Sequence, residues 1–243
     1  MFKKKEKVTR SKLLAERCKK QMEYSRFRKM NEFIYSKPSD KGFDFMNDVT
    51  KFKQYHEAYD EIACKWPVKP VDHIIQKIES FAGPDWDKKW IIADLGCGQY
   101  PTIKVKLNKK AKVHSFDIIS HHKDIIAANM VNVPLDNSSV DIAVYSLSLM
   151  ATNIKDLMVE ANRLLKKHGM LMIAEVSSRF EDLKIEKFEG KLKSFGFQII
   201  EREYLPPNNF FVFINAVKKK NLLKQEISNL PDITLKPCLY KPR

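Results

Sequence analysis

From residue 90 onward, the sequence alternates between segments that suit β-strands and segments that suit amphipathic helices. The strand-like segments are short runs of β-branched, aromatic and other apolar residues, at 90–95, 112–117, 140–149, 169–176, 197–205 and 210–219. Helical patterns at 153–167 and 180–196 separate the later ones. This alternation predicts an α/β fold, with a mostly parallel sheet and helices on both faces. Only PPNN separates the last two strands, which therefore predict a terminal antiparallel hairpin.

The segment before the first strand has a helical pattern. Apolar residues recur at helical spacing across 22–34, one further helix is expected across 43–66, and a third across 71–83 ends at Gly83. The organisation that we expect has four parts: a basic flexible arm (1–20), an N-terminal helical extension (21–83), a core domain (84–217) and a basic C-terminal tail (218–243).

Positive charge is concentrated at the two ends of the chain. Residues 1–30 carry twelve Lys or Arg against three Asp or Glu, 218–243 carry seven against two, and the residues between carry 25 of each sign. Basic arms on a neutral body favour a polyanionic partner such as nucleic acid, because each neutralised phosphate releases condensed counterions. An import signal bound by a receptor protein is an equally good interpretation of the first ten residues.

No sequence pattern indicates a metal centre, a membrane span or a disulfide framework. The four cysteines include no C-x-x-C pair, and no zinc-ligand spacing is present. No apolar run approaches the ~20 residues that cross a bilayer, and the N-terminus lacks the apolar stretch of a secretory signal. We expect no metal, no membrane association and reduced thiols inside the cell.

The first strand ends in a glycine-rich turn, ADLGCG. Glycines at a strand-to-helix turn let the backbone approach a ligand closely. Pro101 stands where the dinucleotide fingerprint needs its third glycine, so the turn does not match an NAD site. Asp117 ends the next strand, where its carboxylate can accept both ribose hydroxyls of S-adenosyl-L-methionine. Gly96 and Gly98 would face the amino-acid part of that cofactor, and Asp94 would position the loop or reach the ammonium group through water.

The turn and the terminal hairpin together favour one fold class. They match the class I (Rossmann-like) S-adenosylmethionine methyltransferase layout better than the dinucleotide-binding layout. The alternative interpretation is an ordinary tight turn that holds no ligand.

Longer segments of the sequence point to one family within this fold class. The segments ADLGCG, VPLDNSSVDIAVYSLSLMATNIKDLMVEANRLLK, IAEVSSRFED and KWPVKPVD resemble the eukaryotic ribosomal RNA-processing methyltransferase family that includes nucleomethylin. The similarity extends over about residues 26–215. The resemblance implies a nucleolar enzyme that methylates N1 of an adenine in large-subunit ribosomal RNA, within the pre-ribosome. A member of the family is also linked to silencing of ribosomal DNA.

The resemblance also implies cofactor contacts at particular positions. His56 matches the family's histidine in the helix before the sheet, while Gly96 and Asp117 match the loop contact and the ribose acid. The remaining implied contacts are Asn129, Met130 and Ser146. Here the chain departs from the family pattern, which usually has Asp at 129 and often Cys at 146. Asn129 can still accept a hydrogen bond from the adenine amino group, but without a charge. Gln99 stands where the family usually has Asp, which would weaken catalysis if that acid contacts the substrate.

Three residues are candidates for contacting the acceptor. Met150 and Asn153 follow the strand that delivers the substrate in such enzymes, although Asn153 also suits the N-cap of the following helix. Arg179 follows a later strand, where it can bind a phosphate or clamp acidic groups. No catalytic base is identified, and adenine N1 needs none because its lone pair is available at neutral pH.

Three hypotheses remain at this point. The leading one is a ribosomal RNA methyltransferase, located in the nucleolus. The second is a cofactor-binding module that is recruited to ribosomal DNA chromatin and catalyses little. The third, a small-molecule methyltransferase, fits poorly with the basic arms.

Overall fold

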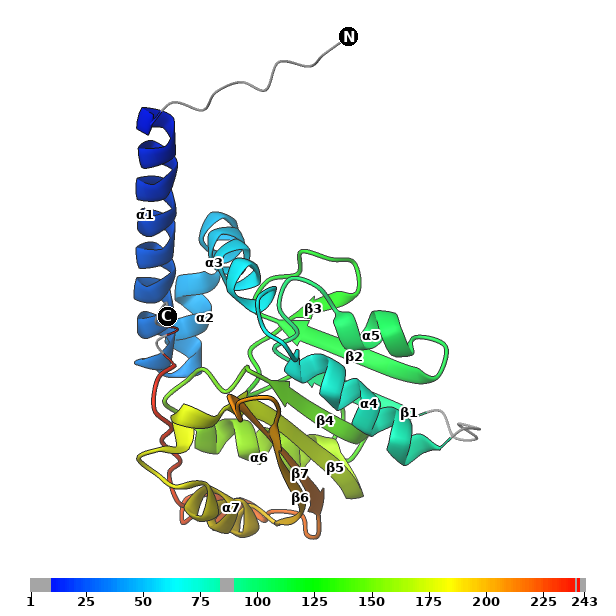
Figure 1. Ribbon diagram of the computed structural model, residues 1–243. Coiled ribbons are helices and arrows are strands. Elements are labelled where there is room, and N and C mark those ends of the chain that lie inside the picture. Colours follow the sequence, from blue (N-terminus) through cyan, green and yellow to red (C-terminus); the bar gives the residue numbers. More distant parts are fainter. Residues whose placement is uncertain (1–9, 84–89, 239, 241–243) are drawn as a thin grey trace.

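The computed structural model describes residues 10–83, 90–238 and 240, and shows one seven-stranded sheet (Figure 1). The strands are β1 (Trp90–Leu95), β2 (Ala111–Asp117), β3 (Ile125–Ala127), β4 (Val140–Ser146), β5 (Leu165–Val176), β6 (Phe197–Leu205) and β7 (Phe211–Lys218). Their order is β3-β2-β1-β4-β5-β7-β6. The first five strands pair in parallel, whereas β7 runs antiparallel to both β5 and β6. The predicted α/β class and terminal hairpin are confirmed.

Helices cover both faces of the sheet, as the alternation requires. On one face, α4 (Pro70–Ala82) and α5 (Thr102–Leu107) share a buried cluster with alternate residues of β4, including Ile142 and Val144. On the other face, α6 (Ile154–Leu164) and α7 (Ile185–Ser194) bury the intervening residues, including Ala143 and Tyr145. A strand buried on both sides explains the near-continuous apolar run of β4.

Ahead of α4, the N-terminal extension has three helices where two were expected. These are α1 (Arg10–Tyr35), α2 (Ser39–Met46) and α3 (Val49–Ala63), and they share a third apolar cluster that includes Phe27 and Phe52. The expectation of one helix across 43–66 is wrong. Asp48 interrupts it, because its side chain accepts hydrogen bonds from the amides of Thr50 and Lys51 and so begins a new helix.

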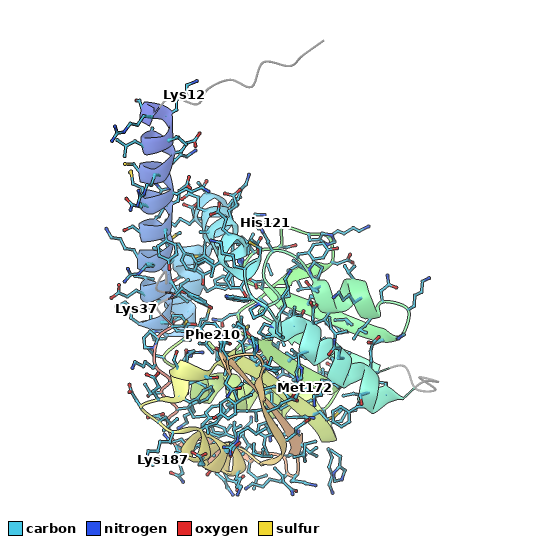
Figure 2. The ribbon with its side chains drawn as sticks, viewed as in Figure 1. Lys12, Lys37, His121, Met172, Lys187 and Phe210 are labelled. Atoms are coloured by element: carbon cyan, nitrogen blue, oxygen red, sulfur yellow. The ribbon has the colours of Figure 1, made fainter. Side chains whose placement is uncertain are left out.

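The first half of α1 projects away from the rest of the molecule (Figure 1). Residues 10–23 are all exposed, whereas Phe27, Met30 and Ile34 are buried. Residues 10–20 of the predicted basic arm are therefore helical, and its first nine residues lie outside the described residues. Figure 2 shows Lys12 near the free end of this helix and Lys37 near its packed end.

The C-terminal segment also differs from the expected basic tail. After β7 and the short α8 (Lys224–Ile227), the chain packs back along the domain and buries four apolar side chains, Leu230, Ile233, Leu235 and Cys238. We refer to residues 229–238 and 240 as the C-terminal strap. Among the described residues, no helix combines the length and the apolar character that a membrane span needs.

Candidate cofactor and acceptor site

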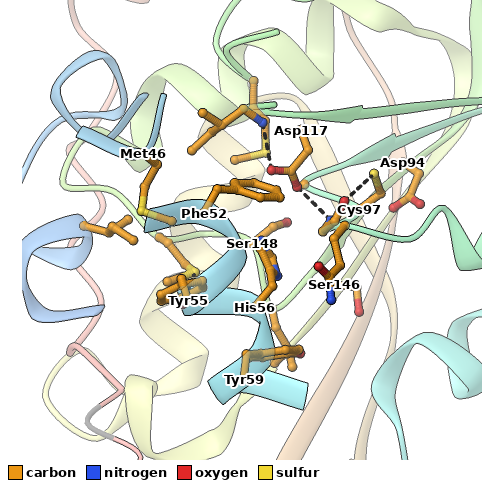
Figure 3. A pocket seen from close by; sticks show the side chains of 18 of the residues that line it. Met46, Phe52, Tyr55, His56, Tyr59, Asp94, Cys97, Asp117, Ser146 and Ser148 are labelled. Atoms are coloured by element: carbon orange, nitrogen blue, oxygen red, sulfur yellow. Dashed lines mark hydrogen bonds between the residues drawn. The ribbon is translucent and has the colours of Figure 1, made fainter. Parts of the chain in front are cut away.

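A cavity of about 320 Å³ lies at the carboxyl ends of β1, β2 and β4, beneath α2 and α3 (Figure 3). This is the edge at which parallel α/β sheets bind ligands. The structure brings together nine of the eleven residues singled out from the sequence. The nine are His56, Asp94, Gly96, Gly98, Asp117, Asn129, Met130, Ser146 and Met150.

The glycine turn is fixed in a form that only glycine permits. Gly96 has a φ of +84°, and a Cβ built on it would lie 2.4 Å from the Cβ of Ser148. The Ser148 hydroxyl donates to the carbonyl of Leu95 at 2.6 Å, so the two loops are joined directly above the sheet. The turn thus presents bare backbone to the cavity, with no side chain at Gly96 in the way.

Asp117 lies at the end of β2 with its carboxylate in the cavity wall. One oxygen accepts from the Gly98 amide and the other from the Ile118 amide, each at 2.7 Å. Burial raises its pKa to about 6, although both backbone hydrogen bonds oppose that shift. Each carboxylate oxygen can accept more than one hydrogen bond, so capacity remains for a ligand's hydroxyls.

Asp94, at the end of β1, is a second buried carboxylate in the same wall. It is only 3% exposed, and its pKa is raised to about 7 by burial and, secondarily, by the charge of Asp117. Two buried carboxylates that repel each other favour a positively charged ligand between or beside them. The cavity therefore has the electrostatic character that a cationic cofactor requires.

His56 closes the cavity from the α3 side. Its ring lies 4.3 Å from the Phe52 ring, centroid to centroid, and a Cβ at Gly98 would lie 3.5 Å from its Cε1 atom. Burial, with a smaller contribution from His121, lowers its pKa to about 4. The imidazole is therefore neutral at physiological pH, and its two nitrogens offer one donor and one acceptor.

The remaining cofactor candidates line the cavity from the loop after β3 and from the end of β4. Asn129 uses its side-chain oxygen to accept from the Val131 amide at 3.3 Å. Met130 places its sulfur 3.1 Å from the Cβ position of Gly96, and Ser146 ends β4. Gln99 also lines the cavity, and its amide donates to Asp60 of α3 at 2.8 Å, which joins the glycine turn to the covering helix.

A second, apolar half of the cavity is built by the N-terminal extension. The aromatic and sulfur-containing side chains that line this half include Phe43, Met46, Tyr55, Tyr59 and Trp66. The Tyr55 hydroxyl is oriented by the side chains of Asn31, at 3.0 Å, and Met150, at 3.7 Å. Sequence reasoning did not single out Phe43, Met46 or Trp66 for the cavity, because nothing in a helical pattern shows which apolar residues face a ligand and which face the core.

Two acceptor candidates do not line the cavity. Asn153 occupies the N-cap position of α6, but its side chain makes no cap bond there. Its oxygen instead accepts from the Ser39 amide at 2.8 Å, at the start of α2. Asn153 therefore caps a helix, as expected, but the helix is α2 and not α6.

Arg179 is 1% exposed and forms a buried ion pair with Glu175 at 2.8 Å. Its position supports clamping of an acidic group and not the expected contact with a phosphate. Within the parts of the chain that the structure describes, no cluster of His, Cys, Asp and Glu could hold a metal ion.

The fold and the placement of this cavity match the class I, Rossmann-like methyltransferase layout. A family model described as "Hypothetical methyltransferase" matches residues 13–243, and the chain belongs to this methyltransferase family. Together with the curated relatives described next, this match confirms the family resemblance noted in the sequence.

Curated relatives agree with that assignment. Ribosomal RNA-processing protein 8 of Dictyostelium discoideum is 37% identical over 90% of this chain and 57% of its own length. The protein of the same name from Mus musculus is 37% identical over 97% and 49%. The 25S rRNA (adenine(645)-N(1))-methyltransferase of Schizosaccharomyces pombe is 34% identical over 95% and 72%. The chain thus spans about half to three fifths of the first two relatives.

Solved structures support the fold alone. A Burkholderia thailandensis 1,6-didemethyltoxoflavin-N1-methyltransferase, crystallised with S-adenosylhomocysteine, has a TM-score of 0.54 and 13% identity, covering 69% of this chain and 85% of that one. The [4+2]-cyclase SpnF has a TM-score of 0.55 and 14% identity, covering 76% and 97%. The presence of a cyclase among these neighbours shows that the fold does not define the reaction.

Proposed function

We propose that this protein is an S-adenosyl-L-methionine-dependent methyltransferase that acts on large-subunit ribosomal RNA, at N1 of an adenine. The observation that carries the proposal is the two-part cavity. Buried carboxylates and a bare glycine turn form one half, and an aromatic chamber from the N-terminal extension forms the other. The name of the fission-yeast relative supplies the nucleotide and the atom.

The residues present fit the cofactor. Asp117 keeps acceptor capacity for a ribose diol, the Gly96 backbone is free of a side chain, and Asn129 offers polar atoms to an adenine ring. Asp94 and Asp117 would stabilise the positive charges of the sulfonium and ammonium groups. When bound, the cofactor supplies a methyl group on a positively charged sulfur, so the protein itself contributes alignment and electrostatics.

The acceptor half suits a purine that has left its helix. N1 lies on the pairing edge, so the base must be unpaired or flipped out before it can react. Rings such as those of Tyr55, Tyr59 and Trp66 can stack on or enclose such a base and exclude water. No proton needs to be removed from N1 before attack, because its lone pair is free at neutral pH.

The projecting part of α1 is the surface that we expect to contact the phosphate backbone. Residues 10–29 carry eight Lys or Arg against two Glu, and all eight cations are exposed. Three cations of the C-terminal segment are engaged within the protein: Lys218 is buried against two backbone carbonyls, Lys220 pairs with Glu226 and Lys236 pairs with Glu181. Because the packed half of α1 contributes Ile34 to the cavity, RNA lying along this helix would be directed toward the acceptor site. An import receptor is the competing partner, and a nucleolar location would agree with either.

Methyl transfer to RNA tests the proposal. Purified protein and labelled cofactor are incubated with unmodified large-subunit ribosomal RNA fragments, and modified nucleosides are identified by mass spectrometry. We expect 1-methyladenosine, and none with the Asp117→Ala variant. Cofactor binding without transfer to any ribosomal RNA fragment would contradict the proposal and favour the binding module.

A further inference from the structure

The C-terminal strap ends against the helices that form the acceptor half of the cavity. Tyr240 packs its ring against those of Phe27, Tyr59 and Trp66, with the Trp66 ring nearly parallel at 6.3 Å. The carbonyl of Cys238 accepts from Asn31, whose side-chain oxygen in turn accepts from Tyr55. Tyr55, Tyr59 and Trp66 all line the cavity. The strap therefore supports the aromatic wall from behind.

A second connection runs from the strap through Arg179. The backbone of Lys236 both donates to the carbonyl of Arg179, at 2.9 Å, and accepts from its Nε atom, at 3.0 Å. The same guanidinium lies 4.6 Å over the Tyr35 ring of α1 and contacts the Glu175 carboxylate at 2.8 Å. One buried side chain thus joins the strap, α1 and the end of β5.

The buried ion pair also holds the loop after β4. Arg179 donates to the carbonyl of Leu149 at 2.8 Å, and Glu175 accepts from the Leu149 amide at 3.1 Å. Both polar groups of one residue are therefore fixed by the pair. The flanking residues, Ser148 and Met150, line the cavity on either side. A shift of Arg179 would move the loop that separates the cofactor half from the acceptor half.

We propose that the C-terminal strap holds the aromatic wall of the acceptor site in place from behind, and that Arg179 is a positioning residue that transmits the docking of the strap to the loop at Ser148–Met150. The inference rests on the proposed function, because it assigns an acceptor to the apolar half of the cavity. The strap touches neither Asp94 nor Asp117 in the described contacts, so the cofactor half should form without it. The substrate affected is the RNA base, not the cofactor.

Two variants test this relay. Arg179→Lys keeps the charge but removes the planar fork that reaches Glu175, Leu149 and Lys236 at once. Tyr240→Ala removes the ring behind Tyr59 and Trp66. Ile233→Ala is the matched control, because Ile233 is equally a buried strap residue, at 1% exposure, but it packs in the α6–α7 cluster and not in the cluster of the acceptor half.

Hydrogen exchange in the absence of RNA supplies a readout that does not need activity. Arg179→Lys should raise the exchange rate of the amides at 147–150 by about tenfold, as expected when a hydrogen bond to a charged group is lost. Tyr240→Ala should raise the same rates, because it loosens the end of the strap that holds Arg179. Ile233→Ala should lower the melting temperature without changing those amides. Loop exchange unchanged in Arg179→Lys, or raised equally in Ile233→Ala, would overturn the proposal.

Kinetics then separate the two substrates. In Arg179→Lys and Tyr240→Ala, KM for RNA should rise about tenfold while the cofactor Kd stays within twofold of the wild-type value. A matching loss of cofactor affinity would show general destabilisation and contradict the relay. If the wild-type protein methylates no RNA, the proposed function fails, and the exchange experiment still decides whether the strap positions the loop.

Discussion

Replacing Asp117 by alanine is the sharpest test of the cofactor half. In the proposed complex, this carboxylate accepts two hydroxyls of the ribose. Hydrogen bonds to a charged group contribute about 1.5–3 kcal/mol each, so the variant should lose about 3–6 kcal/mol of binding free energy. That loss corresponds to at least a hundredfold increase in the cofactor Kd.

The substitution should leave the protein folded, because two effects on stability oppose each other. A carboxyl whose pKa is about 6 in the folded protein and about 3.9 in the unfolded chain costs roughly 3 kcal/mol when it is ionised at pH 7. Removing it relieves that cost. It also takes the acceptor from the amides of Gly98 and Ile118, which costs about 1–3 kcal/mol each where water cannot replace it.

Isothermal titration calorimetry with S-adenosylhomocysteine measures the effect, and Asp141→Ala is its control. Asp141 is a buried aspartate that accepts from the Ile91 amide at 2.9 Å and contacts Lys166 at 3.0 Å, but it does not line the cavity. The control should lower the melting temperature and keep the wild-type Kd. An Asp117→Ala protein that is folded and binds within threefold of the wild type would refute the assignment of the ribose site.

Three further predictions follow from the same geometry. Gly96→Ala should lower the free energy of unfolding by about 1–3 kcal/mol in chemical denaturation, because φ is positive at this residue and a Cβ would overlap Ser148. As a control, Gly190→Ala in α7 should raise the free energy of unfolding by about 0.5–1 kcal/mol, because a Cβ there meets open space. In the cofactor-free protein, raising the pH from about 4 to 7 should raise the melting temperature of Asp117→Ala relative to that of the wild type. The reason is that, over this range, the folded wild type keeps a proton on Asp117 that its unfolded chain has already released. A difference in melting temperature that stays constant with pH would contradict the raised pKa of Asp117. Exchanging three exposed cations of α1 for glutamine, namely Lys12, Arg17 and Lys20, should weaken the salt dependence of RNA binding. In filter binding, the slope of the logarithm of the association constant against the logarithm of the salt concentration should decrease in magnitude by about 2. An unchanged slope would exclude this helix as the RNA contact.

The sheet and the cofactor half could be predicted from the sequence because both depend on local patterns. Two glycines follow β1, and an aspartate ends β2, which is the pattern typical of a ligand-binding turn. Parallel order then brings those ends to one edge without further information.

The acceptor half and the C-terminal strap could not be predicted in the same way. Arg179 follows a strand and resembles a phosphate ligand in sequence, and only the packing of Tyr35 and Lys236 around it shows that it is buried. Likewise, Asn153 carries a cap signature, but its partner Ser39 lies 114 residues away in the chain. Contacts between distant segments leave no periodic signal in either segment.

The span of chain between Asn31 and Cys238 bears on how the molecule acquires its activity. These two residues are hydrogen-bonded across 207 positions of sequence, whereas the sheet pairs that carry Asp94 and Asp117 are separated by only about twenty. Closing the longer loop costs more chain entropy and delays contacts of this kind. During refolding, we therefore expect affinity for the nucleoside cofactor to return before the capacity to modify RNA. The interval between the two would report the docking of the two ends of the chain against each other.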